Sequence, residues 1–174
     1  LPSWTDRSNQ VIHIGTLSEP YGMEILQNIA LVLERSRSGI TIDAISRFPS
    51  DSIRQRFEER RRALGGLPHL RLIDPVPSQQ LIALLGKYRV ALSLIDDSGQ
   101  NSLAVPTKLY EHTIAGVVSV VSARAAQAEY IEKVGVGAVV ASNDPAAWVA
   151  AIQVLPVPAG PRTITWGDLR RASR

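Results

Sequence analysis

Thr107, Lys108 and Glu111 are three polar residues whose spacing could bind a charged ligand. They stand in a segment, 105–116, that begins Val-Pro-Thr-Lys and ends with Gly116. Proline suits the first turn of a helix and glycine the position past its end, so the segment predicts a short helix. The free N–H groups at a helix start can hold an anion, and Lys108 adds a full charge there. Because residues three or four apart share a helix face, Glu111 lies one turn beyond Lys108 on that face. Its carboxylate could there accept hydrogen bonds from the hydroxyl groups of a ligand. A nucleoside diphosphate carries both kinds of group.

The segments around this helix alternate between apolar runs and amphipathic stretches. Predicted strands span 11–14, 40–45, 70–73, 88–95, 117–122 and 137–141, and predicted helices span 22–37, 51–64, 79–85, 126–134 and 145–155. Nearly continuous apolar strands, rich in Val and Ile and separated by helices, indicate a parallel sheet covered on both faces. We therefore expect an α/β fold, a Rossmann-like doubly wound parallel sheet of about six strands. Ser78 is expected to cap the helix that follows it, because its hydroxyl can bond an early N–H.

Candidate binding residues lie at the ends of the predicted strands. In a doubly wound sheet, ligands bind beyond the carboxyl ends of the strands. The residues that this rule and the central helix select are Gly15, Thr16, Arg47, Val76, Asn101, Ser102, Thr107, Lys108 and Glu111. No residue is assigned as catalytic, because no Ser/His/Asp or Cys/His arrangement suggests a nucleophile.

The order Val-Pro-Thr-Lys-Leu-Tyr-Glu, followed by Ala-Gly and a valine-rich strand, resembles the nucleotide-sugar signature of GT-B glycosyltransferases. It is most similar to the GT4-like retaining group, the glycosyl transferases group 1. The resemblance implies that the chain is the C-terminal, donor-binding half of a two-domain enzyme. Such an enzyme moves a sugar from a nucleoside diphosphate sugar to a glycan, lipid or other acceptor, as in polysaccharide biosynthesis, and needs no metal.

The resemblance also implies roles for individual residues. Glu111 would bind the ribose hydroxyls, and the helix start with Lys108 would lie on the diphosphate. The Gly15 turn would approach the phosphates, and the turn 74–76 would lie beside the base.

Three positions depart from the family's pattern. Leu103 stands eight residues before Glu111, where many members have a second glutamate near the transferred sugar. The turn after the first strand lacks the Arg or Lys that clamps the diphosphate in other members, which leaves Lys108 as the cation. Val118 stands where the family usually has proline. Two alternatives therefore stay open: a nucleotide-sugar epimerase of the same architecture, and a degenerate interaction domain in a glycan-assembly complex.

The composition is ordinary for a soluble globular domain. Of 174 residues, 45% are hydrophobic and 20% are charged, and there is no cysteine for a disulfide or a thiolate metal site. No spacing matches a metal site, and the Gly15 turn lacks the full Gly-x-Gly-x-x-Gly pattern of NAD-binding proteins. Much of the positive charge behind the net +3 lies in 54–62 and 162–174. A basic face there could meet anionic lipid, nucleic acid or a phosphorylated ligand, but a solvated helix face is the favoured interpretation.

We divide the chain into a nucleotide-sugar-binding domain, residues 1–155, and a linker with a C-terminal crossing helix, residues 156–174. Prolines interrupt the helical pattern after residue 155, and Trp166 and Leu169 then resume it. By the resemblance, this last helix returns to an N-terminal acceptor-binding domain of the same protein, without which the chain is expected to be inactive. The expected partners are that domain and the nucleotide-sugar donor, with no nucleic acid. We expect a cytoplasmic protein, with a peripheral membrane contact left open.

The three histidines receive separate interpretations. His13 lies inside an apolar strand and is expected to be a core residue whose ring nitrogens are bonded. His69 precedes a strand and is expected at the surface. His112 is expected not to work with Glu111, because adjacent helix residues do not share a face.

Overall fold

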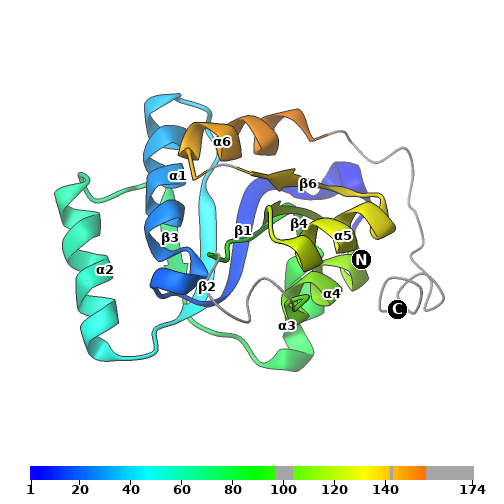
Figure 1. The fold of residues 1–174 in the computed structure, drawn as a ribbon, viewed down its shortest axis with the longest axis horizontal. Helices are drawn as coiled ribbons and strands as arrows, with labels where there is room; N and C mark the ends of the chain where they lie inside the picture. Colours follow the sequence, from blue (N-terminus) through cyan, green and yellow to red (C-terminus); the bar gives the residue numbers. More distant parts are fainter. Residues whose placement is uncertain (97–103, 142, 156–174) are drawn as a thin grey trace.

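The computed structural model describes residues 1–96, 104–141 and 143–155. Six parallel strands form one sheet in the order β3-β2-β1-β4-β5-β6 (Figure 1). The strands are β1 (Ser8–Thr16), β2 (Ile42–Arg47), β3 (Leu70–Ile73), β4 (Tyr88–Ser93), β5 (Val118–Ser122) and β6 (Gly137–Val140). The order reverses between β1 and β4, which is the switch point of a doubly wound sheet.

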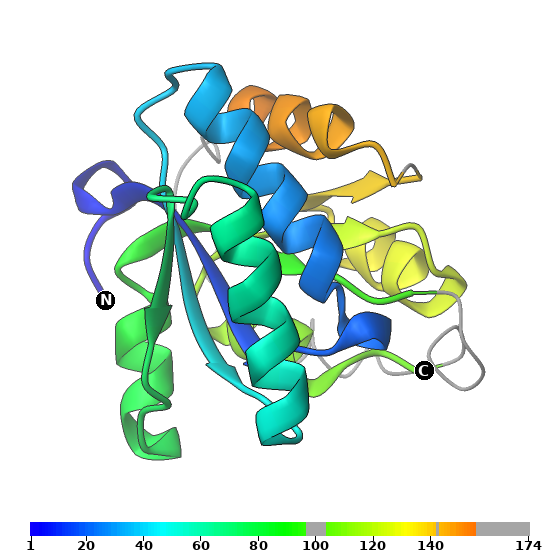
Figure 2. The same ribbon diagram turned by 90° about the vertical axis from the view of Figure 1, so that its left-hand side faces the viewer.

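Helices cover both faces of this sheet. One face carries α1 (Met23–Arg35), α2 (Asp51–Ala63) and α6 (Pro145–Val154), and the other carries α3 (Ser78–Leu85), α4 (Thr107–Ile114) and α5 (Ala125–Val134). Two short 3-10 helices, η1 (Trp4–Asp6) and η2 (Glu19–Tyr21), flank β1. Figure 2 shows α1 and α2 side by side in front of the strands. In the described ranges, no helix has the length and apolar character that crossing a membrane would require. The predicted fold class is confirmed.

The core follows the periodicities of the sequence. Leu26, Ile29 and Leu33 recur at helical spacing on α1 and are fully buried against the sheet and α6. Ile12 and Ile14 alternate with His13 along β1 and pack on the opposite face, under α3. A third cluster joins α4 to α5. Strands buried on both faces explain why their sequences are nearly continuously apolar.

Two helix starts differ from the predictions. Helix α3 begins at Ser78 itself, Pro77 occupies the N-cap, and no side chain within the described residues caps it, so the predicted Ser78 cap is wrong. Pro106 likewise occupies the N-cap of α4 rather than a place in its first turn. Because Ser78 lies one position inside the helix, its hydroxyl no longer faces the first N–H groups. By contrast, Asp144 does cap α6, accepting a hydrogen bond from Ala146 N at 3.0 Å.

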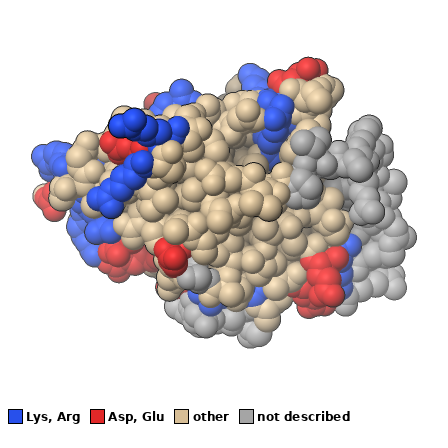
Figure 3. All heavy atoms as spheres, turned by 90° about the horizontal axis from the view of Figure 1, so that it is seen from above, with Lys and Arg blue, Asp and Glu red and all other residues tan. Residues whose placement is uncertain are grey.

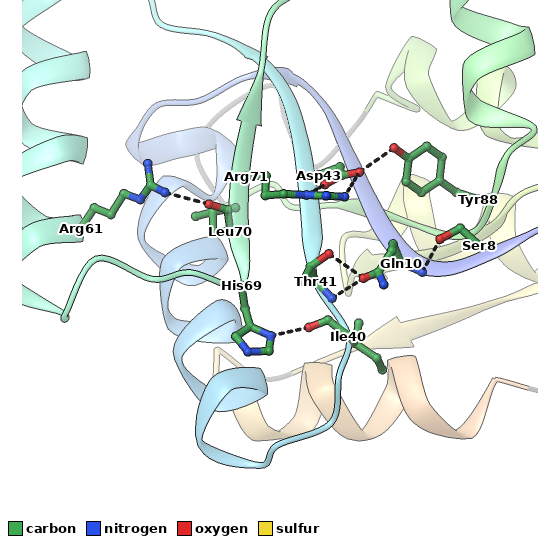
Figure 4. A network of polar contacts seen from close by, with 10 residues as sticks. All are labelled: Ser8, Gln10, Ile40, Thr41, Asp43, Arg61, His69, Leu70, Arg71 and Tyr88. Carbon is green, nitrogen blue, oxygen red and sulfur yellow. Dashed lines mark hydrogen bonds and ion pairs between the residues drawn. The ribbon is translucent and has the colours of Figure 1, made fainter.

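β1 starts at Ser8, three residues before the predicted strand. The first residues of β1 are polar, so hydrophobic patterning does not predict them as strand. Their polar groups form hydrogen bonds with the neighbouring chain instead. Gln10 Oε1 accepts hydrogen bonds from both the backbone N–H and the hydroxyl of Thr41, the latter at 2.6 Å (Figure 4). Cross-strand bonding therefore extends β1 beyond what hydrophobic patterning predicts.

A second polar network lies on the α3 face (Figure 4). The buried carboxylate of Asp43 on β2 accepts hydrogen bonds from Arg71 at 2.6 and 2.8 Å and from the Tyr88 hydroxyl at 2.7 Å. Burial, with the Asp43 carboxylate, raises the pKa of Tyr88, so the hydroxyl stays a donor. The network ties three strands together.

Asp43→Ala is expected to destabilise the fold by about 2 kcal/mol, because it leaves the Tyr88 hydroxyl and Arg71 without their acceptor. Tyr88→Phe removes one bond only and should cost about 1 kcal/mol. Lys133→Ala is the control, since Lys133 forms an exposed pair with Glu129 that is worth at most about 0.5 kcal/mol. Urea denaturation measures all three, and an Asp43 variant as stable as the Lys133 variant would contradict the structural role of the network.

Candidate functional site

Helix α4 presents its start at the carboxyl end of the sheet. It follows β4 and returns directly to the beginning of β5, so its N-terminus points toward the strand ends. Pro106 is extended at the N-cap, and within the described residues no side chain caps this start. The first N–H groups of the helix are therefore available to an anion, which the helix dipole also favours.

The other end of α4 is closed as the sequence predicts. Gly116 has a φ of 64°, a left-handed conformation that favours glycine. Its N–H donates to Thr113 O at 3.0 Å, and the N–H of Val117 donates to His112 O at 2.8 Å. These two bonds form a Schellman motif, which satisfies carbonyls at the helix end. On the inner side of the helix, Leu109 and Thr113 are buried, as predicted.

Lys108 reaches from α4 to the end of β1. Its Nζ atom lies only 3.4 Å from the place that a Cβ on Gly15 would occupy. Gly15 also has a φ of 117°, so both the conformation and the close approach favour glycine at this position. The chain leaves β1 toward one face of the sheet and leaves β4 toward the other, which makes this the switch point where doubly wound sheets bind ligands. Lys108 and Gly15 meet at this switch point.

The lysine is a cation partly withdrawn from water. Its side chain is half-buried, and within the described residues it forms no ion pair. Burial lowers the pKa of Lys108 to about 8, and the nearby charge of Glu111 opposes this decrease only in part. The spacing of Lys108 and Glu111 would most simply indicate an exposed ion pair. The helix does not form that pair. A partly desolvated cation with no ion-pair partner among the described residues is a candidate anion site.

Two buried histidines lie near this lysine, and their importance was missed at the sequence level. His13 is fully buried as predicted, but neither ring nitrogen has a hydrogen-bond partner among the described residues, so the expected bonding is not found there. His112 is also fully buried; its Nδ1 lies 2.9 Å from Ser119 Oγ, and in the same part of the chain its Nε2 has no partner. Burial, followed by the charge of Lys108, lowers the pKa of His13 well below its ordinary value and that of His112 to about 3. Both rings are neutral at pH 7, so they add no charge beside Lys108.

The remaining predicted residues lie along the same edge. Thr16 and Arg47 are exposed partners at the ends of β1 and β2, where Leu17 N donates to Arg47 O at 2.8 Å. Thr107 is exposed and Glu111 half-buried on α4. Val76 lies in the turn after β3. Strand β3 is two places from β1 in the sheet, so the two strands are roughly 10 Å apart at the usual spacing. The structure thus brings Gly15 and Lys108 into contact and places Val76 on a neighbouring loop. Asn101 and Ser102, like Leu103, lie outside the described residues.

Other charged groups of the described chain serve the fold. The arginines of α2 gather at one end of the molecule (Figure 3). Arg56 pairs with Glu19, Arg60 donates to Asn28 at 2.8 Å, and Arg61 donates to two backbone carbonyls. These three arginines attach α2 to its neighbours, while Arg54, Arg56 and Arg62 remain exposed at the surface of this helix. His69, predicted at the surface, is half-buried and bonded to the Ile40 carbonyl at 2.7 Å. In the ranges that the structure describes, no three His, Cys, Asp or Glu side chains converge as metal ligands would.

A scan against protein-family profiles finds no match, and neither does a sequence comparison with curated proteins. Solved structures do match. The C-terminal domain of the glycosyl transferase group 1 family protein LpcC from Francisella tularensis superimposes with a TM-score of 0.65 at 15% identity, covering 87% of this chain and 80% of that one. The chain has the fold of a GT-B C-terminal domain.

Longer proteins contain a domain of the same fold. A UDP-forming α,α-trehalose-phosphate synthase from Burkholderia vietnamiensis matches with a TM-score of 0.66 at 14% identity, covering 98% of this chain and 41% of that one. An E. coli trehalose-6-phosphate protein bound with UDP-2-fluoro glucose matches with a TM-score of 0.61 at 15% identity, covering 98% of this chain and 40% of that one. The chain therefore spans about two fifths of the length of these two proteins.

Proposed function

We propose that this chain is the donor-binding domain of a retaining glycosyltransferase that uses a nucleoside diphosphate sugar. The observation that carries the proposal is the position of Lys108, a half-buried cation over Gly15 at the start of α4. A diphosphate placed there would receive backbone N–H groups, the positive end of a helix and an ammonium group together. The fold shared with glycosyltransferases supports this choice among anionic ligands.

In this proposal the diphosphate is the leaving group. Sugar transfer breaks the bond between the anomeric carbon and the diphosphate, a bond to the acceptor oxygen forms on the same face of the sugar, and the proton of the acceptor hydroxyl passes to the departing diphosphate. Negative charge then grows on the departing diphosphate, where fixed donors and Lys108 stabilise it, so no metal is required. We assign no catalytic residue, because the reacting sugar would lie in a cleft completed by an N-terminal domain.

The nucleoside would extend along the edge of the sheet toward β3. Glu111, half-buried one turn beyond Lys108, would accept hydrogen bonds from the two ribose hydroxyls. The backbone around Val76, two strands from β1, would face the base. Thr16, next to Gly15 at the end of β1, would contact the phosphates, and its pairing partner Arg47 at the end of β2 would lie one strand nearer the base. A cytoplasmic enzyme of glycan assembly, with an acceptor of glycan or lipid type, fits this assignment.

Glu111→Gln is expected to weaken binding of UDP or GDP about tenfold, because a neutral amide replaces the charged acceptor of two ribose hydroxyls. The same variant should bind inorganic diphosphate as the wild type does, since that ligand has no ribose. Isothermal titration calorimetry with UDP, GDP and diphosphate measures both effects, and Glu132→Gln on the exposed side of α5 is the matched control.

Each result of this titration has a separate meaning. Equal losses for UDP and for diphosphate would place Glu111 at the phosphates and contradict the ribose assignment. Unchanged UDP binding in Glu111→Gln would contradict the site altogether. A wild-type chain that binds no nucleotide would favour a non-catalytic interaction domain.

A further inference from the structure

The segment before β1 is attached to the sheet by an arginine of β4. Arg89 donates from Nε to Trp4 O at 3.1 Å and from Nη2 to Thr5 O at 2.7 Å. Charge-assisted bonds to two successive carbonyls fix this segment against the beginning of the sheet. Arg7, at the end of the segment, is therefore presented from an anchored backbone.

Arg7 reaches across to the C-terminal end of α4. Its Nη1 donates to Ala115 O at 2.9 Å and to Gly116 O at 2.7 Å. The guanidinium lies 5.7 Å from the centre of the Trp4 ring, and its Nε donates to Pro2 O at 3.4 Å. Carbonyls beyond a helix end lack partners within the helix, and a cation there also complements the helix dipole. Arg7 thus adds two hydrogen bonds to the Schellman bonds of Gly116 and Val117 at this end of the helix.

The contact also depends on the glycine at position 116. A Cβ at Gly116 would lie 3.2 Å from Arg7 Nη2, closer than ordinary van der Waals contact. Gly116 thus serves two purposes, since it takes the left-handed conformation and lets the guanidinium approach. Helix α4 has only eight residues, about 12 Å in length, so a shift of one end moves the other.

We propose that Arg7 is a positioning residue, which holds α4 so that Lys108 stands over Gly15 and Glu111 keeps its place one turn further along the helix. The helix carries its ligand-binding groups at one end and is fastened by Arg7 at the other. When a positioned group is displaced by about 1 Å, its contribution to binding or catalysis can decrease severalfold to a hundredfold. The proposal takes its ligand from the proposed function, but its geometry depends only on the Arg7 contacts.

Arg7→Gln and the charge-preserving Arg7→Lys test this role, with Arg35→Gln as control because Arg35 is exposed on the last turn of α1. Calorimetry with UDP gives the affinity, and NMR of the lysine ε-methylene group gives the pKa of Lys108. Arg7→Gln is expected to weaken UDP binding about tenfold while the domain stays folded by circular dichroism. It should also raise the pKa of Lys108 from about 8 toward its ordinary value, because a loosened α4 lets the ammonium reach water.

Arg7→Lys should keep UDP affinity and the pKa of Lys108 close to their wild-type values, since an ammonium can still donate to two carbonyls. UDP affinity and a Lys108 pKa that match the Arg35→Gln control would overturn the proposal, and so would unfolding of both Arg7 variants. If the wild type binds no nucleotide, the proposed function fails, yet the Lys108 pKa in Arg7→Gln still decides whether Arg7 positions α4.

Discussion

Lys108→Met is expected to weaken the binding of a nucleoside diphosphate by about 1.5–3 kcal/mol, roughly 10- to 150-fold. The methionine keeps most of the side-chain volume over Gly15 but removes the charge that faces the diphosphate. The same change should raise the unfolding midpoint of the free protein at pH 7. Burial lowers the pKa of Lys108, so the folded state disfavours its charged form, and an uncharged side chain removes that cost.

Opposite signs for affinity and stability distinguish a binding lysine from a structural one. Lys133→Met is the matched control, because Lys133 is exposed on α5 and pairs with Glu129 at 2.9 Å. Neither UDP affinity nor the unfolding midpoint should change by more than a few tenths of a kcal/mol in this control. A Lys108 variant that lost stability and kept its UDP affinity would show that the lysine supports the fold.

The affinity for UDP is expected to fall about tenfold between pH 7 and pH 9, because Lys108 loses its proton through a pKa of about 8. The wild type must take up a proton to bind above this pH, so calorimetry in two buffers of different ionisation enthalpy should show proton uptake. The stability of the fold is expected to change in the opposite direction, increasing as the pH rises. The unfolded lysine keeps an ordinary pKa, so the cost of its burial fades and stability rises between pH 8 and about 10.5.

Lys108→Met should remove the pH dependence of UDP affinity in this range. His13 and His112 cannot replace it, because burial holds the pKa values of both rings below their ordinary value. The terminal phosphate of the nucleotide titrates near pH 6, below the range of this experiment. An equal decrease in the wild type and in Lys108→Met would assign the effect to another group.

The sequence was sufficient to predict the layered fold, and it indicated the edge of the sheet at which a ligand is expected. Apolar strands between amphipathic helices leave few arrangements other than a doubly wound parallel sheet, and strand ends then mark the ligand edge. Gly116 was recognisable because a glycine past a short helix has a local reason to be there. Leu109 and Thr113 followed from helical spacing alone.

What the sequence could not show depends on contacts between distant segments. The approach of Lys108 to Gly15, and the decrease in the lysine pKa that burial causes, require α4 and β1 to be placed against each other. The sequence indicates that His13 is an ordinary core residue. Only the structure shows that its ring nitrogens have no partner among the described residues. Arg7 gave no signal at all, because its acceptors are backbone carbonyls more than a hundred residues away.

An NMR titration of the ¹⁵N-labelled chain with UDP tests the central claim most directly. The diphosphate is proposed to bind at the start of α4 beside the end of β1. The amide signals of Gly15, Thr16, Thr107 and Lys108 are therefore expected to shift most, with smaller shifts at Glu111 and Val76. Shifts confined to α1 and α6, or no saturable shift near Lys108, would contradict the account.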